Sequence, residues 1–600
     1  MDKGLDYYEL MALLLRARRL TLVSAIVLGA LPAWAQEVAP ASEAPPPTPE
    51  VAPDPDLRSE LNAELFYELL VGEMSWARGD YANAISLLME AARSTQDARL
   101  YRRAADIALQ SRAGQRALGV AQSWQQAFPE SREANRYVLQ ILLALNRVSD
   151  TSEPLRRELA ATPAPAKPAA YMAIVQLYSR VSDKALAAAV VEDALQADLQ
   201  DPATGPAAWA MLGHLRLAAE QKQLAQQAVE RSHALTPYNG AAALLALELM
   251  ESGNTQVEPI VRGYLDNTPS SGIRMAYARV LMAQQRHSDA REQLEAVLMQ
   301  SPELPDAWLA MASLQAQTSD WEGAQRSLRS FVPLAERIPD TGMRQQALTQ
   351  AALLGARAAL PTKDYATATT WLDRIPASEN TLETQSLRAL VLAKQGRLPQ
   401  ARALIRAVPA RDATQEKHKR RAEVQLLREA GADQEAYLLQ LTLHQQDPQD
   451  NDMAYDAALL AERAGKFETM ERILREIMVR QPDYFHAANA LGYSLAERGI
   501  RLDEARTLVE QALHYAPEDP FITDSLAWVE FRAGNRTRAL QLLEQAYAQR
   551  NDVEIAAHLG EVLWSLGHKD RALEVWRQAL QRQPDNDTLQ ATLRRLNVQP

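Results

Sequence analysis

The sequence lacks cysteine altogether and contains few glycines and few aromatic residues. Without cysteine the chain can form no disulfide bridge, thiol nucleophile or thiolate metal ligand, and no lipid can be attached through that residue. Its 23 glycines and 6% aromatic residues leave a composition dense in Ala, Leu, Gln, Glu and Arg, which favours helix. The hydrophobic fraction of 47% is ample for a continuous core, so the composition excludes a wholly disordered chain.

An excess of positive charge is also missing. The formal net charge is −12, so the chain as a whole repels phosphate backbones and anionic membrane surfaces. Loss of residues 1–35, considered next, would leave a charge of −13 and hence a mature protein that is still acidic. Nucleic acid is therefore not an expected partner.

The first residues have the pattern of an export signal. Three arginines between residues 16 and 19 precede an apolar stretch from Leu20 to Leu31, and small residues at positions 33 and 35 suit cleavage before Gln36. The apolar stretch is shorter than the ~20 residues that span a bilayer. We expect a cleavable signal peptide and a periplasmic protein, with an uncleaved membrane anchor as the alternative. Met11 is a second candidate start.

Prolines beyond residue 57 recur at a nearly constant spacing. Their separations are 32 to 39 residues, and after an irregular stretch they resume at 34 and 35 residues. The prolines that close successive units lie at positions 129, 163, 202, 237, 269, 302, 448, 482, 517 and 584. Glycines at positions 396, 431, 465, 534 and 567 keep the same phase. A period near 34 residues is that of the tetratricopeptide repeat, in which each unit is a pair of helices.

Large and small residues recur inside each unit as two packed helices require. In the first helix the stretch Trp209–Gly213 places large residues beside a small one that lets two helices approach closely. In the second helix Ala84, Leu88 and Ala91 are spaced to lie on one helical face, buried against the preceding helix. Proline then ends the second helix, because it lacks the amide hydrogen and clashes with the preceding turn.

These patterns predict an all-α tetratricopeptide-repeat superhelical solenoid of about fifteen helix pairs. The pairs extend from about Asn62 to Asp585, a capping helix covers Asp587–Val598, and the register is least regular over Val332–Thr362. Each unit is stable only when stacked on its neighbours. The segments expected along the chain are a signal peptide (1–35), a Pro-rich disordered tether (36–57), an N-terminal repeat segment (58–162), a middle array (163–332), a divergent array (333–450) and a C-terminal array with its cap (451–600).

No motif for catalysis, cofactor binding or metal binding is present. None of the nine histidines lies in a zinc-protease arrangement, and the sequence has no nucleophile elbow, phosphate loop or dinucleotide fingerprint. His214, His233, His558 and His568 are interpreted as surface or satisfied helix residues, because a metal site needs three or four converging donors. The chain is therefore expected to be no enzyme and to hold no cofactor or metal.

Surface residues of the first helices near the C-terminus are the candidate binding residues. First helices line the concave side of this repeat type, where aromatic rings alternating with hydrogen-bonding groups suit an extended peptide or a partner helix. In three successive units the residues in phase are His486, Asn489 and Tyr493; Asp524, Ser525, Trp528 and Phe531; and His558, Glu561 and Trp564. Trp528, Phe531 and Trp564 fit an inter-helix core equally well, whereas Asp524 and His558 are stronger candidates because a polar inner residue needs a partner.

Three strings near the C-terminus carry a resemblance to a known family. They are Asn489-Ala-Leu-Gly-Tyr-Ser-Leu-Ala496, Asp524-Ser-Leu-Ala-Trp528 and Ala556-Ala-His-Leu-Gly-Glu-Val-Leu-Trp564. Over roughly residues 483–597 the chain resembles the large periplasmic tetratricopeptide proteins of proteobacteria, and among these the lipoprotein adaptors of carboxyl-terminal processing proteases. Elsewhere the resemblance rests on repeat number and layout.

The resemblance implies a scaffold that binds a serine protease together with its cell-wall hydrolase substrates. Members anchored in the outer membrane carry a lipid-modified cysteine after the signal, whereas Ala35 is followed here by Gln36. No lipid anchor is therefore expected, and outer-membrane association is left open, as is self-association. Two alternatives remain: a scaffold for envelope polysaccharide export or outer-membrane assembly, and an enzyme whose site is assembled across distant helices.

Overall fold

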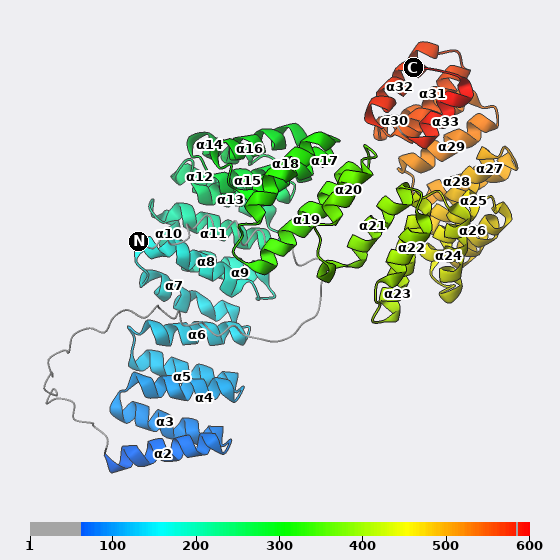
Figure 1. The fold of residues 1–600 in the computed structure, drawn as a ribbon. Coiled ribbons are helices and arrows are strands. Elements are labelled where there is room, and N and C mark those ends of the chain that lie inside the picture. Colours follow the sequence, from blue (N-terminus) through cyan, green and yellow to red (C-terminus); the bar gives the residue numbers. More distant parts are fainter. Residues whose placement is uncertain (1–61, 584–585) are drawn as a thin grey trace. The chain divides into compact units, whose positions relative to one another are not determined.

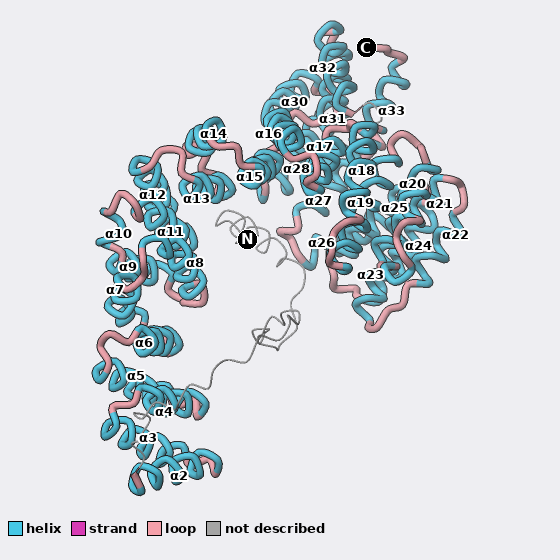
Figure 2. Tube along the Cα trace, turned by 60° about the vertical axis from the view of Figure 1, so that its left-hand side comes forward, coloured by secondary structure: helices cyan, strands magenta, loops and turns pink. Residues whose placement is uncertain are grey.

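The computed structural model describes residues 62–583 and 586–600. The signal peptide (1–35) and the tether (36–57) predicted from the sequence lie outside the described residues. The described chain contains thirty-two α-helices and three short 3-10 helices, and no strand occurs within it. Figures 1 and 2 show these helices joined by short loops. None of the described helices is both long and apolar enough to cross a bilayer.

The contacts between residues divide the chain into two units, and the boundary in the sequence falls between Asp320 and Trp321. Unit 1 comprises the described residues up to Asp320. Its helices are α2 (Ala63–Ala77), α3 (Tyr81–Thr95), α4 (Ala98–Gln110), α5 (Gly114–Ala127), α6 (Arg132–Ala144), η2 (Val148–Thr151), α7 (Ser152–Ala160), η3 (Ala164–Ala166), α8 (Lys167–Tyr178), α9 (Lys184–Ala194), α10 (Gln196–Gln200), α11 (Gly205–Ala218), α12 (Lys222–Leu235), α13 (Gly240–Glu251), α14 (Glu258–Asn267), α15 (Ser271–Ala283), α16 (His287–Gln300) and α17 (Pro305–Gln317).

Unit 2 comprises the described residues from Trp321 to Pro600. Its helices follow one another with the same short loops as those of unit 1. They are α18 (Trp321–Ala335), α19 (Thr341–Ala359), α20 (Tyr365–Leu372), η4 (Ala377–Glu379), α21 (Leu382–Lys394), α22 (Leu398–Ala407), α23 (Ala413–Glu429), α24 (Asp433–Gln446), α25 (Asn451–Arg463), α26 (Phe467–Arg480), α27 (Phe485–Glu497), α28 (Leu502–Tyr515), α29 (Pro520–Arg532), α30 (Arg536–Gln549), α31 (Val553–Ser565), α32 (Lys569–Arg582) and α33 (Asp587–Leu596).

The prediction of an all-α tetratricopeptide-repeat solenoid is confirmed. Without the short α10 and the terminal α33, the described helices number thirty, which is the number that the fifteen predicted helix pairs require. The first pair begins directly after Asn62, whose side chain caps α2. The register is irregular where expected, because α18 carries Pro333 in its last turn and α19, with 19 residues, exceeds the usual length.

Helix ends follow the residues that mark them in the sequence. Nine of the ten prolines that were predicted to close successive repeats lie in loops between helices, and the tenth, Pro584, lies outside the described residues. The glycines of the repeat follow the first helix of a pair in the left-handed region, as at Gly465, where φ is 70°. A residue with a Cβ is strained in that conformation, so glycine favours the sharp turn into the second helix.

We call the first helix of each pair the A helix and the second the B helix. In the C-terminal pairs of unit 2, successive A helices approach one another more closely than successive B helices do, as α27 does α29 and α29 does α31, whereas in unit 1 the B helices α7 and α9 also contact each other. The A helices therefore form the inner wall of the stack. One hydrophobic core extends through the C-terminal pairs from Val424 to Leu593, so no pair there has a core of its own.

Candidate functional site

The predicted binding residues lie on three A helices of unit 2, namely α27, α29 and α31. His486, Asn489 and Tyr493 follow one face of α27 with spacings of three and four residues. This stripe connects two side-chain clusters. The His558 cluster contains Tyr493, Glu497, Asp524, Trp528 and His558. The His486 cluster contains Tyr455, Tyr484, Phe485 and His486.

The His558 cluster is held together by polar contacts between neighbouring A helices. His558 Nδ1 lies 2.9 Å from both carboxylate oxygens of Asp524, one repeat earlier in the chain. The Trp528 ring stacks on the imidazole, with centroids 4.3 Å apart and planes 22° from parallel. Trp528 Nε1 donates to Glu497 Oε2 at 2.7 Å, and the Tyr493 hydroxyl lies 3.4 Å from His558 Nε2. These contacts connect α27, α29 and α31.

The His558 cluster is a buried ion pair rather than an open acid–base site. His558 and Asp524 are only 4% and 7% exposed, and Trp528 covers the face of the ring. Burial alone would lower the pKa of His558, but the carboxylates of Asp524, Glu561 and Glu497 outweigh it and raise the pKa above its ordinary value. A substrate has no approach to this imidazole, and the neighbouring hydroxyl is that of a tyrosine. That the chain is no enzyme remains a prediction.

The stability of unit 2 is expected to fall as the pH rises above neutrality. Because the pKa of His558 is raised in the folded chain, its stabilising contribution is complete below the ordinary histidine pKa of about 6.5 and is lost as the pH rises through the folded value. Urea unfolding between about pH 6 and about pH 9 would measure this decline.

His558→Gln should remove that part of the pH dependence. His486→Gln serves as the control, because His486 is exposed and has no carboxylate partner among the described residues. Equal slopes for wild type and His558→Gln would contradict the prediction.

The remaining residues predicted in α29 and α31 are also held within the chain. Glu561 is 5% exposed and accepts two bonds from the Arg595 guanidinium, with Nη1 at 2.7 Å. The Ser525 hydroxyl donates to the carbonyl of the residue four positions earlier, at 3.0 Å. Phe531 and Trp564 are half-buried, and Phe531 lies against the Trp528 ring. The sequence left Phe531 and Trp564 open between core and surface, and the structure places them at the boundary.

The His486 cluster is the accessible end of the stripe. His486 is exposed, and its ring lies 4.1 Å from that of Phe485, 5.8 Å from Tyr484 and 6.2 Å from Tyr455. The Tyr484 hydroxyl donates to Asp452 Oδ1 at 2.8 Å, which fixes that ring against α25. Half-exposed rings around an exposed imidazole offer apolar area with a hydrogen-bonding group at its centre.

Carboxylates surround the rings of this stripe. Burial, followed by Glu497, Asp524, Glu554 and Glu462, raises the pKa of Tyr493, and burial with Asp456 and Glu462 raises that of Tyr455. Burial also raises the pKa of Asp456, against the opposing effect of two arginines. Several carboxylates thus lie close to the tyrosines of this stripe.

One polar atom on the stripe has no hydrogen-bond partner within the described chain. Asn489 Oδ1 is buried yet accepts no hydrogen bond there. An unpaired buried carbonyl costs roughly 1–3 kcal/mol. The side-chain amide of Asn489, between His486 and Tyr493, is therefore only partly satisfied within the described chain.

Sequence reasoning missed four members of these clusters, Tyr455, Tyr484, Phe485 and Glu497, and also Arg595, which binds Glu561. The repeat period itself could have indicated two of them. Tyr455 precedes Asn489 by one period of 34 residues, and Arg595 follows Glu561 by the same interval. Glu497 carries no such signal, because its contact with Trp528 depends on how two helices pack.

The same pairing over one period occurs in unit 1. His214 on α11 lies 2.8 Å from Glu248 Oε2 on α13, 34 residues later, and is 8% exposed. The interpretation of His214 as a satisfied helix residue is confirmed. An acid and a base one period apart on A helices therefore connect successive repeats in both units.

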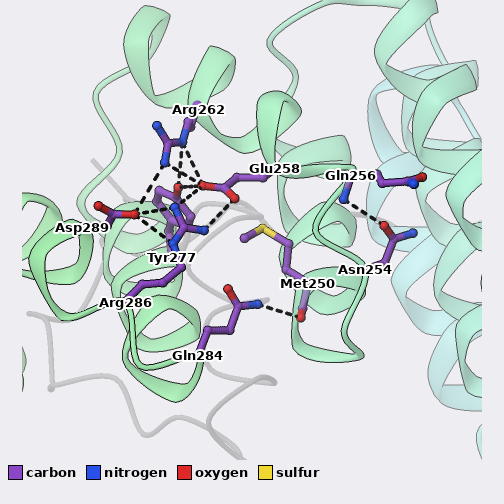
Figure 3. A network of polar contacts seen from close by, with 9 residues as sticks. All are labelled: Met250, Asn254, Gln256, Glu258, Arg262, Tyr277, Gln284, Arg286 and Asp289. Carbon is purple, nitrogen blue, oxygen red and sulfur yellow. Dashed lines mark hydrogen bonds and ion pairs between the residues drawn. The ribbon is translucent and has the colours of Figure 1, made fainter. Parts of the chain in front are cut away.

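Unit 1 also holds a dense cluster of charged groups on α14, α15 and α16 (Figure 3). Arg286 donates to both oxygens of Glu258, at 2.7 and 2.9 Å, and to Asp289. Tyr277 and Arg262 also donate to Glu258. The Arg286 bonds, opposed by burial and reinforced by those from Tyr277, lower the pKa of Glu258 to about 2. The members bind one another, so the cluster ties three helices together. No group of residues that could hold a metal ion occurs in the described chain.

Comparison with known proteins agrees with the repeat architecture. The tetratricopeptide repeat family model matches residues 267–332 and 530–596. A segment of 116 residues, 19% of this chain, is 43% identical to the TPR repeat-containing protein PA4667 of Pseudomonas aeruginosa. The segment covers 20% of that relative, so the chain matches about a fifth of its length. Repeats of this kind generally mediate protein–protein interaction.

Three solved structures are similar to the chain, each at low sequence identity. The APC/C hetero-tetramer Cut9–Hcn1 is 14% identical, with a TM-score of 0.27 over 89% of this chain and 96% of that one. MamA from Desulfovibrio magneticus is 15% identical, with a TM-score of 0.24 over 28% of this chain and 97% of that one. A tetratricopeptide repeat protein from Parabacteroides merdae is 15% identical, with a TM-score of 0.29 over 48% of this chain and 97% of that one. Scores this low say nothing about what this chain binds.

Proposed function

We propose that the chain is a non-catalytic scaffold that binds another polypeptide along the α25–α27 part of its inner wall. The observation that carries the proposal is the His486–Asn489–Tyr493 stripe. It combines half-exposed rings around an exposed imidazole at one end, the polar side chain of Asn489 in the middle and carboxylates close to its tyrosines. A ligand that matches it has an apolar side chain to lie between the rings and a basic group to meet the carboxylates.

The His558 cluster has a different role in this proposal. Its members are largely satisfied by one another, so they set the spacing of α27, α29 and α31 and keep the inner wall rigid. A rigid wall lowers the ordering cost that a ligand meets on binding. The predicted residues Asp524, Ser525, Trp528, His558 and Glu561 would then support the site from behind.

At the finer level, we propose that the scaffold acts in the periplasm and links a carboxyl-terminal processing protease to cell-wall hydrolase substrates. The export pattern of residues 1–35 and the resemblance of the strings near Asn489, Asp524 and Ala556 support this proposal. The mechanism is an increase in effective concentration, because two partners held on one scaffold meet far more often than free ones. This mechanism needs no catalytic group on the scaffold.

Co-purification tests the finer proposal. The chain, immobilised and incubated with periplasmic extract, should retain a processing protease and at least one wall hydrolase, as identified by mass spectrometry. Recovery of neither would overturn it, and recovery of polysaccharide-export or outer-membrane assembly proteins would favour the alternative scaffold.

The site is tested by removing the accessible rings. Tyr484→Ala/His486→Ala should weaken capture of the retained partner about tenfold or more, because aromatic anchors dominate the energy of such interfaces. A matched control is His514→Ala/Tyr515→Ala, an exposed histidine–tyrosine pair at the end of the B helix α28, with ring centroids 5.5 Å apart. Equal binding by both double variants would place the site elsewhere.

A further inference from the structure

The outer face of α2, the first helix of unit 1, is apolar and exposed. Phe66, Tyr67, Leu70 and Met74 are 53%, 64%, 46% and 44% exposed. They lie within less than three turns of one helix, so they form one continuous patch. Single exposed apolar residues are ordinary, whereas a contiguous patch on a soluble chain marks a contact surface.

The opposite face of α2 is already occupied. Gly72 and Ser75 are buried, and a Cβ on Gly72 would lie 3.5 Å from the Leu88 side chain of α3. Apolar side chains therefore lie both on the face of α2 that packs against α3, as with Leu69, and on its exposed face, with three glutamates beside them. The last helix of the chain, α33, differs, because Asp587, Arg594 and other polar groups cover its outer face. A repeat array needs such a polar face at each end that meets water, and α2 lacks one.

The exposed face has the spacing of a coiled-coil seam. Ala63, Tyr67, Leu70, Met74 and Ala77 follow one another at intervals of four, three, four and three residues. This spacing keeps the side chains facing one partner helix along the whole element. Fifteen residues of helix give a seam about 22 Å long.

We propose that this face pairs with the same face of a second copy of the chain, with the two α2 helices antiparallel. Glu64 and Arg78 flank the seam on one side, at its two ends. Neither has an ion pair with another described residue, and antiparallel pairing brings Glu64 of each copy against Arg78 of the other. The seam is thus complementary to itself in both shape and charge.

The charges also select this geometry over a parallel one. Parallel pairing would place Arg78 against Glu73 of the other copy. Glu73 is already bound by the Arg103 guanidinium of its own chain through two contacts of 2.7 Å. End-to-end stacking of copies is disfavoured as well, because the polar outer face of α33 offers no apolar seam to α2. The result is a closed dimer of two identical surfaces and not an open filament.

Cross-linking tests the pairing directly, since the chain contains no cysteine of its own. Leu70 lies near the two-fold axis of an antiparallel pair, so Leu70→Cys in the full chain should link to itself through a short bis-maleimide. Ala63 lies more than ~15 Å along the axis from its own copy, so Ala63→Cys alone should not link. Mixed with Ala77→Cys it should link, because these positions face each other. Self-linking of Ala63→Cys, or no link at Leu70, would overturn the antiparallel pair.

Sedimentation of the full chain between about 1 and about 100 µM gives an independent measurement. The wild type should pass from monomer to dimer over this range, and Met74→Glu should stay monomeric because it places a charge in the seam. Met299→Glu is the matched control, as Met299 is 87% exposed in the same unit but outside the seam. A wild-type chain that stays monomeric over the whole concentration range overturns the proposal. The face would then be covered by something other than a second copy, either residues before Asn62 or another protein. The pairing is independent of whatever binds the inner wall of unit 2.

Discussion

Replacing Asp524 with alanine is expected to lower the free energy of unfolding of unit 2 by about 3–5 kcal/mol. The substitution removes the carboxylate that lies 2.9 Å from His558 Nδ1. His558, which is only 4% exposed, is then left without its charge partner. Breaking a buried pair on one side costs more than the pair contributes, because the remaining charge is neither solvated nor compensated. Urea unfolding followed by far-UV circular dichroism, near pH 6, measures the loss.

Two further variants identify the cause of that loss. Asp503→Ala on α28 removes a fully exposed carboxylate from an ion pair and should change the stability by less than about 1 kcal/mol. Asp524→Leu/His558→Leu removes both charges and should recover much of the stability lost in Asp524→Ala, because apolar side chains can replace a buried pair. An Asp524→Ala variant as stable as Asp503→Ala would show that the pair does not connect the helices.

Replacing Trp576 with alanine is expected to cost a similar 3–5 kcal/mol for a different reason. Trp576 on α32 is fully buried, and its ring lies against Gly560 of α31 so closely that a Cβ on Gly560 would meet Nε1 at 2.2 Å. The indole fills the space that the glycine leaves open. Alanine leaves a cavity there, and the helices on either side can close it only in part. Thermal and urea unfolding measure the effect.

Gly560 and Trp576 should also be coupled. Gly560→Ala alone should destabilise unit 2, because the added methyl group forces the Trp576 ring to move. In Gly560→Ala/Trp576→Leu the smaller side chain leaves room for the added methyl group. The double variant should therefore lose less stability than the sum of the losses in Gly560→Ala and Trp576→Leu measured singly. Additive losses would mean that ring and glycine do not share one packing site.

Most of the helix ends could be predicted from the sequence because they depend on local chemistry. A proline cannot continue a helix, and a glycine permits the left-handed turn between two helices, whatever lies elsewhere in the chain. Pro302 and Pro517 accordingly lie between helices, and Gly465 has a positive φ. The same reasoning indicated fifteen pairs and the irregular register near Pro333.

The role of the polar residues on the inner wall could not be predicted in this way. The sequence identified Asp524 and His558 as the stronger candidates for binding a ligand, because a polar group on the inner face of a helix needs a partner. The structure shows that each is the other's partner, and that Trp528 covers the pair. It also moves the accessible part of the stripe to His486 and adds Tyr455 and Tyr484, which the sequence did not indicate.

By itself, then, the sequence determined the fold class, the number of repeats and the face on which each side chain lies. These properties follow from the 3.6-residue helical period and from turn chemistry, which act over a few residues. Only the tertiary structure decided which side chains meet across helices, as Asp524 meets His558, and which apolar faces stay uncovered, as on α2. Those outcomes depend on the distance and the angle at which whole helices pack. Both are set by the volumes of many side chains that lie far apart in the sequence.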